Sequence, residues 1–250
     1  MVTGMRKGHS EEYFSDYRDF WWNADFVELL DRRWRLSQAS RLLDIGCGLC
    51  HWSLLLAPFM GADSHITAMD SDPKWAAGNE ELKDKFAALG SFVKFKSGYA
   101  SQIPEPDNTF DVVTCQTVLI HSADPAAVLM EMKRVVKPGG IVICAEPNNL
   151  VGTASLDSND LESDVQVITD RFRERLVYER GRSAAGEGYI SLGDQLPFLF
   201  SSAGFEDLKF YLSDRINPLY PPYKEPARKA DIRQTRITST LDARTVRNDE

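Results

Sequence analysis

Residues 41–52 read RLLDIGCGLCHW, and this stretch decides the fold that we expect. A short apolar run ends at Asp44, the glycines Gly46 and Gly48 then flank Cys47, and a run with helical character follows. Short apolar runs that end in a turn are typical of buried strands in a parallel sheet. Glycines in the turn let the backbone bend sharply and approach a ligand closely. The stretch therefore predicts a strand, a ligand-binding loop and a helix.

The same alternation of strand and helix continues along the chain. Asp72 and Pro73 are typical of a helix start, Gly90 is typical of a helix end, and together they predict a helix between them. A second cap-then-proline signal predicts another helix at 125–136. The further predicted strands lie at 65–70, 92–98, 110–116 and 141–146. The fold class is therefore α/β, a Rossmann-like and mostly parallel sheet with helices on both faces, and the carboxyl ends of its strands share one edge.

The two flanks of this pattern differ from it. An aromatic-rich segment at 10–36 is predicted to be helical, and we expect an N-terminal helical cap or lid at 1–39. The ligand-binding domain is expected at 40–215, with a helical insertion at about 151–190 and an irregular segment at 216–250. Within that domain the sequence predicts helices at 162–180 and 191–204 and a sixth strand at 205–214.

Composition narrows the class of partner. The chain has 29 Lys and Arg against 37 Asp and Glu, a net charge of −8, which argues against a nucleic-acid partner. No run approaches the roughly 20 apolar residues of a membrane span, and the first residues lack the apolar core of a signal peptide. The four cysteines show no disulfide-rich pattern, so we expect a cytoplasmic protein. Its cysteines and histidines do not cluster at metal-ligand spacing, so no metal is expected.

An acidic residue at the end of the second predicted strand narrows the choice of ligand. Asp70 occupies the place from which a carboxylate can accept hydrogen bonds from both hydroxyls of a ribose. Dinucleotide enzymes and enzymes that use S-adenosylmethionine (SAM) share this feature. A dinucleotide fingerprint needs a third glycine, at position 51, and this chain has His51 there. The loop therefore favours SAM over a nicotinamide cofactor, and an oxidoreductase is the less favoured alternative.

Four stretches, in this order, carry a family resemblance: LLDIGCGLCHW, MDSDPKW, IPEPDNTFDVVTCQTVLIH and EMKRVVKPGGIVICAEP. Together they closely resemble the class I SAM-dependent methyltransferases, in particular the small-molecule branch, over roughly residues 40–147. Two positions depart from the family pattern. Cys50 stands where the family often has a third glycine, and Tyr99 stands where it often has an acidic residue that accepts a hydrogen bond from the adenine amino group.

The resemblance implies a set of residues around SAM. It places Asp44, Gly46, Cys47 and Gly48 around the methionine part and Asp70 at the ribose. It places the remaining contacts against the adenine or beside the cofactor, and they are Ser71, Trp75, Tyr99, Ala100 and Gln116. We interpret the Cys47-x-x-Cys50 spacing as incidental rather than as a redox pair.

On the acceptor side, His121 is the first candidate for a general base, because imidazole titrates near neutral pH, and Glu146 is the second. Each also has a purely structural interpretation. The aromatic segment is the best indication of an acceptor site, or else it is simply core, and its candidate residues are Tyr13, Tyr17, Trp21 and Trp22. The sequence thus predicts methyl transfer to a small organic acceptor at O, N or C. A SAM-binding regulator without turnover is the alternative, and a homodimer is left open.

Overall fold

We analysed a computed structural model, which describes residues 18, 21–153 and 162–213. The chain divides into two compact units, one at Trp34–Phe210 and the other formed by Met1–Arg33 with Tyr211–Glu250. The predicted boundaries at residues 39 and 215 stay predictions.

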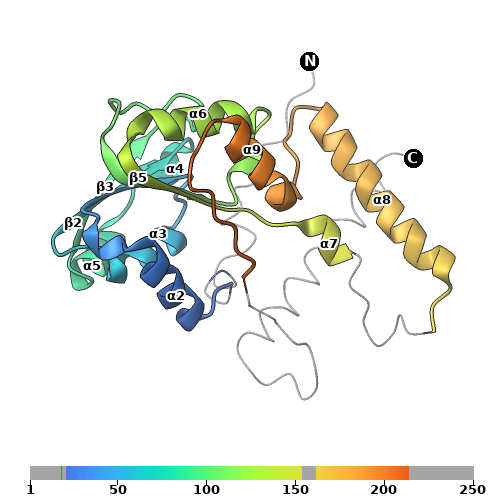
Figure 1. The fold of residues 1–250 in the computed structure, drawn as a ribbon, viewed down its shortest axis with the longest axis horizontal. Helices are drawn as coiled ribbons and strands as arrows, with labels where there is room; N and C mark the ends of the chain where they lie inside the picture. The colour runs from blue at the N-terminus through green and yellow to red at the C-terminus, as the bar shows by residue number, and fades with distance from the viewer. Residues whose placement is uncertain (1–17, 19–20, 154–161, 214–250) are drawn as a thin grey trace. The chain divides into compact units, whose positions relative to one another are not determined.

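The larger unit contains a parallel sheet of five strands, in the order β3-β2-β1-β4-β5 (Figure 1). The strands are β1 (Arg41–Ile45), β2 (Ser64–Asp70), β3 (Ser91–Ser97), β4 (Phe110–Gln116) and β5 (Val136–Ala145). All four neighbouring pairs are parallel. The predicted fold class, an α/β fold of the Rossmann-like type, is confirmed.

Burial explains why the central strands read as apolar runs. In β1 every residue after Arg41 is buried, and β4 is buried except for Asp111. A strand covered on both faces must be apolar on both, which gives the unbroken run rather than an alternation. Figure 1 shows α3 and α5 on one face of the sheet and α6 and α9 on the other.

The helices that connect the strands begin where their capping residues predict. Asp72 accepts a hydrogen bond from the Lys74 amide at 2.9 Å, and Asp124 accepts one from the Ala127 amide at 3.0 Å. The connecting helices are α3 (His51–Leu56), η3 (Ala57–Phe59), α4 (Pro73–Ala76), α5 (Glu80–Ala88), η4 (Leu119–His121) and α6 (Pro125–Val135).

The helix predicted between Asp72 and Gly90 is in fact two helices, α4 and α5. Gly78 separates them, with φ +60, and a Cβ at this residue would lie 2.1 Å from the ring of Phe95. Asn79 then caps α5 by accepting a hydrogen bond from the Leu82 amide at 2.8 Å. The single-helix prediction was wrong because the chain turns at Gly78 to pass β3 closely.

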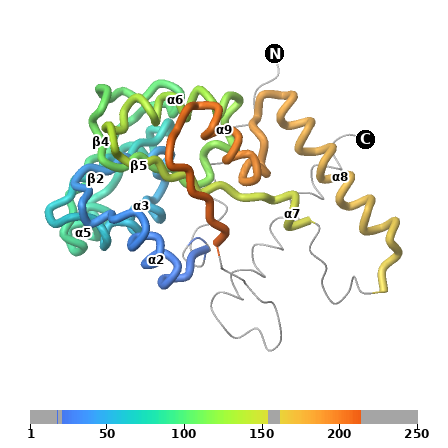
Figure 2. Tube along the Cα trace, viewed as in Figure 1, coloured from blue at the N-terminus to red at the C-terminus, as the bar shows by residue number. Residues whose placement is uncertain are grey.

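The insertion after β5 forms a helical excursion that returns to the sheet. It contains α7 (Asn149–Thr153), α8 (Val165–Ala184), η5 (Leu192–Gln195) and α9 (Leu196–Ser202). Figure 2 shows the chain leaving β5 through α7, running along α8 and coming back to α9. Phe200 of α9 belongs to the core cluster that also contains Leu129 and Met132 of α6.

Two strand predictions need correction. β5 begins at Val136 instead of residue 141, because Phe110 pairs with Val136 across a register irregularity before regular pairing resumes at Val112. The sixth strand predicted at 205–214 is absent from the described part, 205–213. Asp207 has φ +52 there, which interrupts an extended backbone.

The helix α2 (Ala24–Trp34) belongs to the smaller unit except for its last residue. Its buried residues are Phe26, Val27 and Leu30, at the spacing of one helix face. The aromatic rings of Trp22 and Phe26 stack with centroids 5.9 Å apart. The helix predicted for 10–36 is therefore confirmed over its second half, and most of its first half lies outside the described residues.

Candidate functional site at the carboxyl ends of the strands

Most of the candidate site residues in the larger unit gather at one edge of the sheet. Ile45 of β1 pairs with Met69 of β2 and with Cys115 of β4, so these three strands end side by side. The chain leaves β1 toward β2 on one side, while β4 lies on the other. This is the switch point of an open α/β sheet, where such sheets bind their ligands.

The glycine loop after β1 is folded tightly against the neighbouring strand ends. Gly46 and Gly48 have φ of +66 and +48, and the Cys47 amide donates to the Met69 carbonyl at 3.0 Å. A Cβ on Gly46 would lie 2.5 Å from Cγ2 of Val118. Both glycines are therefore needed for backbone conformation, and Gly46 also for space.

Asp70 ties this loop to the end of β2. Its Oδ2 accepts a hydrogen bond from the Gly48 amide at 3.0 Å, and its Oδ1 accepts one from the Asp72 amide at 2.9 Å. These two bonds orient the carboxylate, and a carboxylate oxygen can accept more than one hydrogen bond. The structure thus joins the two features that the sequence singled out separately.

Asp44 has a structural partner that the sequence did not reveal. It is buried, and its Oδ2 accepts a hydrogen bond from the Ser53 hydroxyl of α3 at 2.6 Å. Trp52, the residue before Ser53, donates from its indole nitrogen to the Thr114 hydroxyl at 2.7 Å. Asp44 therefore fixes the start of α3 against β1, and its predicted role beside the SAM amino group stays a prediction.

Cys50, which stands where the family often has a third glycine, adopts a backbone conformation that glycine favours. Cys50 has φ +61 and ψ +23, in the left-handed region, directly before α3. Its amide donates to the Cys47 carbonyl at 2.7 Å, which closes a tight turn. Hydrogen bonding to Cys50, and then burial, raise the pKa of the Cys47 thiol, which stays protonated at neutral pH. The turn has the shape that glycine would give it, at the cost of strain.

That strain gives a prediction from a matched pair of variants. We expect Cys50→Gly to have a free energy of unfolding about 1 kcal/mol larger than Cys50→Ala, because both lose the thiol and only glycine relieves the left-handed conformation. Urea unfolding followed by circular dichroism measures the difference. Equal stability of the two variants, or a more stable alanine variant, would show that the turn is unstrained.

The residues expected around the adenine lie near the ends of β2 and β3. Trp75 of α4 is half-buried, with the Lys74 ammonium 4.4 Å from its ring centroid. Ser71 is exposed, and Tyr99 is 68% exposed, so its phenol is open to solvent. Ala100 packs against the core. Gln116, at the end of β4, is buried beside the loop.

The two candidate bases differ in how the structure holds them. His121 ends η4 and is exposed. Glu146 follows β5, and its carboxylate accepts hydrogen bonds from the amides of Val118 and Leu119 at 2.9 Å and of Ile120 at 3.3 Å. Burial raises the pKa of Glu146 from 4.5 to about 7 against the opposing effect of these amides. Glu146 thus holds the turn that carries His121.

The aromatic candidates for the acceptor belong to the smaller unit. Tyr13 and Tyr17 lie outside the described residues. Trp21 and Trp22 are half-buried, and the Arg18 guanidinium stands 4.9 Å from the ring centroid of Trp21. Their predicted role in acceptor binding stays a prediction.

Several residues near this edge were not predicted from the sequence. Ser53 donates to Asp44, Thr114 accepts from Trp52, and Val118 lies against Gly46 of the loop. A serine inside a helix and a threonine inside a strand carry no local signal. Only the tertiary contacts identify them.

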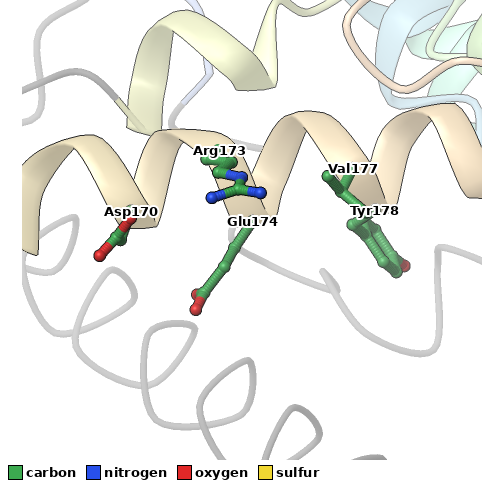
Figure 3. Close-up of a pocket in the computed structure, with 5 residues that line it drawn as sticks. All are labelled: Asp170, Arg173, Glu174, Val177 and Tyr178. Carbon is green, nitrogen blue, oxygen red and sulfur yellow. The ribbon is translucent and has the colours of Figure 1, made fainter.

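A groove along α8 lies apart from this edge (Figure 3). It is lined by Asp170, Arg173, Glu174, Val177 and Tyr178. All five side chains come from one helix, so among the described residues they do not converge on a ligand from several sides. We therefore assign the site to the strand ends.

Residues 18, 21–153 and 162–213 contain no group of three or more His, Cys, Asp or Glu side chains placed to hold a metal ion. They also contain no helix with the length and apolar character that crossing a membrane requires.

The residues at the strand ends fit SAM in shape and chemistry. The loop from Gly46 to Gly48 is a cradle that a Cβ on Gly46 would obstruct, and the carboxylate of Asp70 is oriented beside it. Carboxylate oxygens are acceptors for ribose hydroxyls and for an ammonium group. These acceptors therefore suit a ligand with a ribose and a zwitterionic tail.

Comparison with known proteins agrees with this geometry. A family model described as a methyltransferase domain matches residues 43–144. A demethylmenaquinone methyltransferase from Geobacillus sp. (strain WCH70) is 31% identical over 196 residues, which cover 75% of this chain and 78% of that protein. One from Geobacillus kaustophilus is 36% identical over 126 residues, 50% of this chain and 51% of that protein. The chain thus spans about half the length of several curated relatives that it matches.

A solved structure shares the fold at lower identity. It belongs to a candidate SAM-dependent methyltransferase from Methanococcus maripaludis, which is 15% identical. The TM-score is 0.55, and the match covers 86% of this chain and 94% of that one.

Proposed function

This chain belongs to the class I SAM-dependent methyltransferase family, and on that premise we propose that it transfers a methyl group from SAM to a small organic acceptor. The observation that carries the proposal is the bond from the Gly48 amide to Asp70. It joins a glycine loop and an acidic strand end into one ligand-binding edge, at the switch point of the sheet.

The protein's part in such a reaction is mainly to position the reactants. Bound SAM supplies a methyl group that its positively charged sulfur already activates. Asp70 and the loop from Gly46 to Gly48 would hold SAM, whose methyl group would pass to the acceptor atom as the sulfur–carbon bond breaks and its electron pair stays on sulfur. Holding the three atoms in line is worth several kcal/mol, about 7 or more in favourable cases. A base is needed only where the acceptor arrives protonated.

A reduced quinone is the first acceptor to test. The curated relatives are named for demethylmenaquinone, and a ring carbon of its reduced form becomes nucleophilic when a ring hydroxyl loses its proton. His121 is exposed on the turn after β4 and is our candidate for accepting that proton. The ring carbon gains the methyl group and then loses its own proton, which restores the aromatic ring.

Calorimetry tests the cofactor site. We expect Asp70→Asn to bind SAM about tenfold more weakly than the wild type, because the amide replaces a charged acceptor and sets an NH2 group against a backbone amide. Asp111→Asn is the matched control. That carboxylate also accepts hydrogen bonds from two backbone amides, those of Ser40 and Arg41. It lies near the start of β4, at the opposite end of the strand from the proposed site. Binding of NAD without binding of SAM would overturn the proposal.

Turnover separates the enzyme from a SAM-binding regulator. An enzyme converts SAM to its demethylated product only when an acceptor is present, and mass spectrometry then finds the acceptor heavier by one methyl group. A regulator would bind SAM and give no product with any acceptor. We further propose a cytoplasmic location, which the free thiols of all four cysteines support. A homodimer stays a prediction that sedimentation velocity decides.

A further inference from the structure

A segment of the insertion passes very close to the turn that carries His121. We call residues 186–193, which run from the end of α8 into the first two residues of η5, the strap; they lie where the chain returns to α9 (Figure 2). Gly188 is buried, with φ +82, and a Cβ there would lie 2.2 Å from the Ile120 carbonyl oxygen and 2.9 Å from Cα of His121. Real Cβ atoms do not approach backbone so closely, so only glycine fits.

The strap also meets the end of β5. The Gly193 amide donates to the Pro147 carbonyl at 3.0 Å, and a Cβ on Gly193 would lie 2.9 Å from the carbonyl oxygen of Glu146. The strap therefore touches both chain segments that follow β4 and β5. These are the segments on which the two candidate bases stand.

Buried polar contacts fix the strap at its other side. Glu179 of α8 is fully buried and accepts hydrogen bonds from the Ser191 hydroxyl at 2.6 Å and from Nε of Arg175 at 3.1 Å. The Ser191 hydroxyl also accepts a hydrogen bond from the Leu150 amide at 2.7 Å. A buried carboxylate needs such partners, and removing one of them is costly. Ser191 thus links α7, α8 and the strap.

Two elements therefore hold the η4 turn. The Glu146 carboxylate binds the amides of Val118, Leu119 and Ile120, while Gly188 lies against the carbonyl of Ile120 and the backbone of His121. No side chain of η4 itself takes part in these contacts. The side chains of Leu119 and Ile120 are buried in the core cluster, so core packing and these backbone contacts together hold the turn.

We propose that the strap is a positioning device for the acceptor side of the site, with Gly188 as the positioning residue that sets the place of His121. The inference rests on the proposed function only for its effect on turnover. A Cβ at residue 188 would overlap the backbone of Ile120 and His121, so the turn must move to make room for it. A displacement of about 1 Å can lower a rate about 100-fold when reactants must be aligned.

The test compares Gly188→Ala with Gly186→Ala. Gly186 lies in the same strap and has φ +74, but a Cβ there meets nothing within 4 Å. Both variants therefore carry the same backbone strain, and only Gly188→Ala adds the clash. The first readout is hydrogen exchange at the amides of residues 118–120, relative to the amides of β2. We expect exchange about tenfold faster in Gly188→Ala, from an opening that is about 1.4 kcal/mol easier, and no change in Gly186→Ala.

The second readout is methyl transfer to reduced demethylmenaquinone, with SAM affinity measured by calorimetry. We expect kcat to fall about 100-fold in Gly188→Ala while the Kd for SAM changes less than about threefold. Equal exchange and equal kcat in the two glycine variants would overturn the inference. A wild type that binds no SAM would instead overturn the proposed function, and the exchange measurement would still decide on the strap.

A second pair of variants tests the same inference if the Gly188→Ala protein does not fold. Ser191→Ala releases the strap from Glu179, and Ser201→Ala removes an exposed hydroxyl from α9 as its control. We expect faster exchange at residues 118–120 in the Ser191 variant alone. Unchanged exchange there would contradict the inference.

Discussion

Replacing Gly46 by alanine is expected to weaken SAM binding about 100-fold or more. The new Cβ would lie 2.5 Å from Cγ2 of Val118, and the residue would keep φ +66, a conformation that costs a non-glycine residue about 1–2 kcal/mol. Valine has one strongly preferred rotamer in most backbone settings, so Val118 cannot easily turn aside. The loop must move instead, and it carries the Gly48 amide that Asp70 holds. Titration calorimetry with SAM measures the loss.

Two further variants separate the clash from the strain. Gly90→Ala places alanine at φ +75 with nothing within 4 Å of the Cβ, so it carries strain alone and should leave the Kd for SAM unchanged. The double variant Gly46→Ala with Val118→Ala removes the atom that the new Cβ meets. It should recover at least part of the affinity. A Gly46→Ala protein that binds SAM as the wild type does would show that the loop does not form the site.

The second large effect is a pH dependence of stability caused by Glu146. Burial raises its folded-state pKa from 4.5 to about 7, so the folded protein binds a proton more tightly than the unfolded chain. The resulting stabilisation is complete below about pH 4.5 and is lost as pH rises through about 7. The loss is about 3 kcal/mol, because one pKa unit corresponds to about 1.4 kcal/mol. Glu146→Gln, which does not titrate, should not show it.

The measurement is the free energy of unfolding in urea at pH 5, 6, 7 and 8. We expect the wild type to lose stability relative to Glu146→Gln across this range. Glu131→Gln is the control, because hydrogen bonding to Arg134 lowers the pKa of Glu131, and its contribution is lost only as pH falls below that range. A constant difference between wild type and Glu146→Gln would show that Glu146 is ionised normally.

Predictions from the sequence are correct where local sequence and tertiary contacts favour the same structure. Asp72 and Gly90 marked real helix boundaries because capping depends on neighbours within one turn. Three predictions were wrong. The close approach of Gly78 to Phe95 divides the predicted helix, and the left-handed backbone at Asp207 interrupts the predicted sixth strand. Pairing of Val136 with Phe110 makes β5 begin earlier than predicted.

The candidate site also has features that the sequence predicted and others that only tertiary contacts reveal. Asp44, the glycines of the loop and Asp70 were predicted because strand ends of a parallel sheet must meet at one edge. The sequence offered no means of seeing that Val118 limits the size of residue 46, or that Glu146 holds three amides instead of facing solvent. Those facts depend on which segments pass within contact distance.

By itself the sequence determined the fold class, the edge at which we propose that SAM binds and the glycines of the loop, since hydrophobic periodicity and turn chemistry are local properties. It also marked Cys50 as the exception to a glycine pattern. Only the tertiary structure decided that Cys50 takes the left-handed conformation of the missing glycine, that the strap lies against the turn of His121, and that Glu146 serves that turn. Packing between segments more than 25 residues apart sets the contacts of the strap and of Glu146, and no local pattern encodes them.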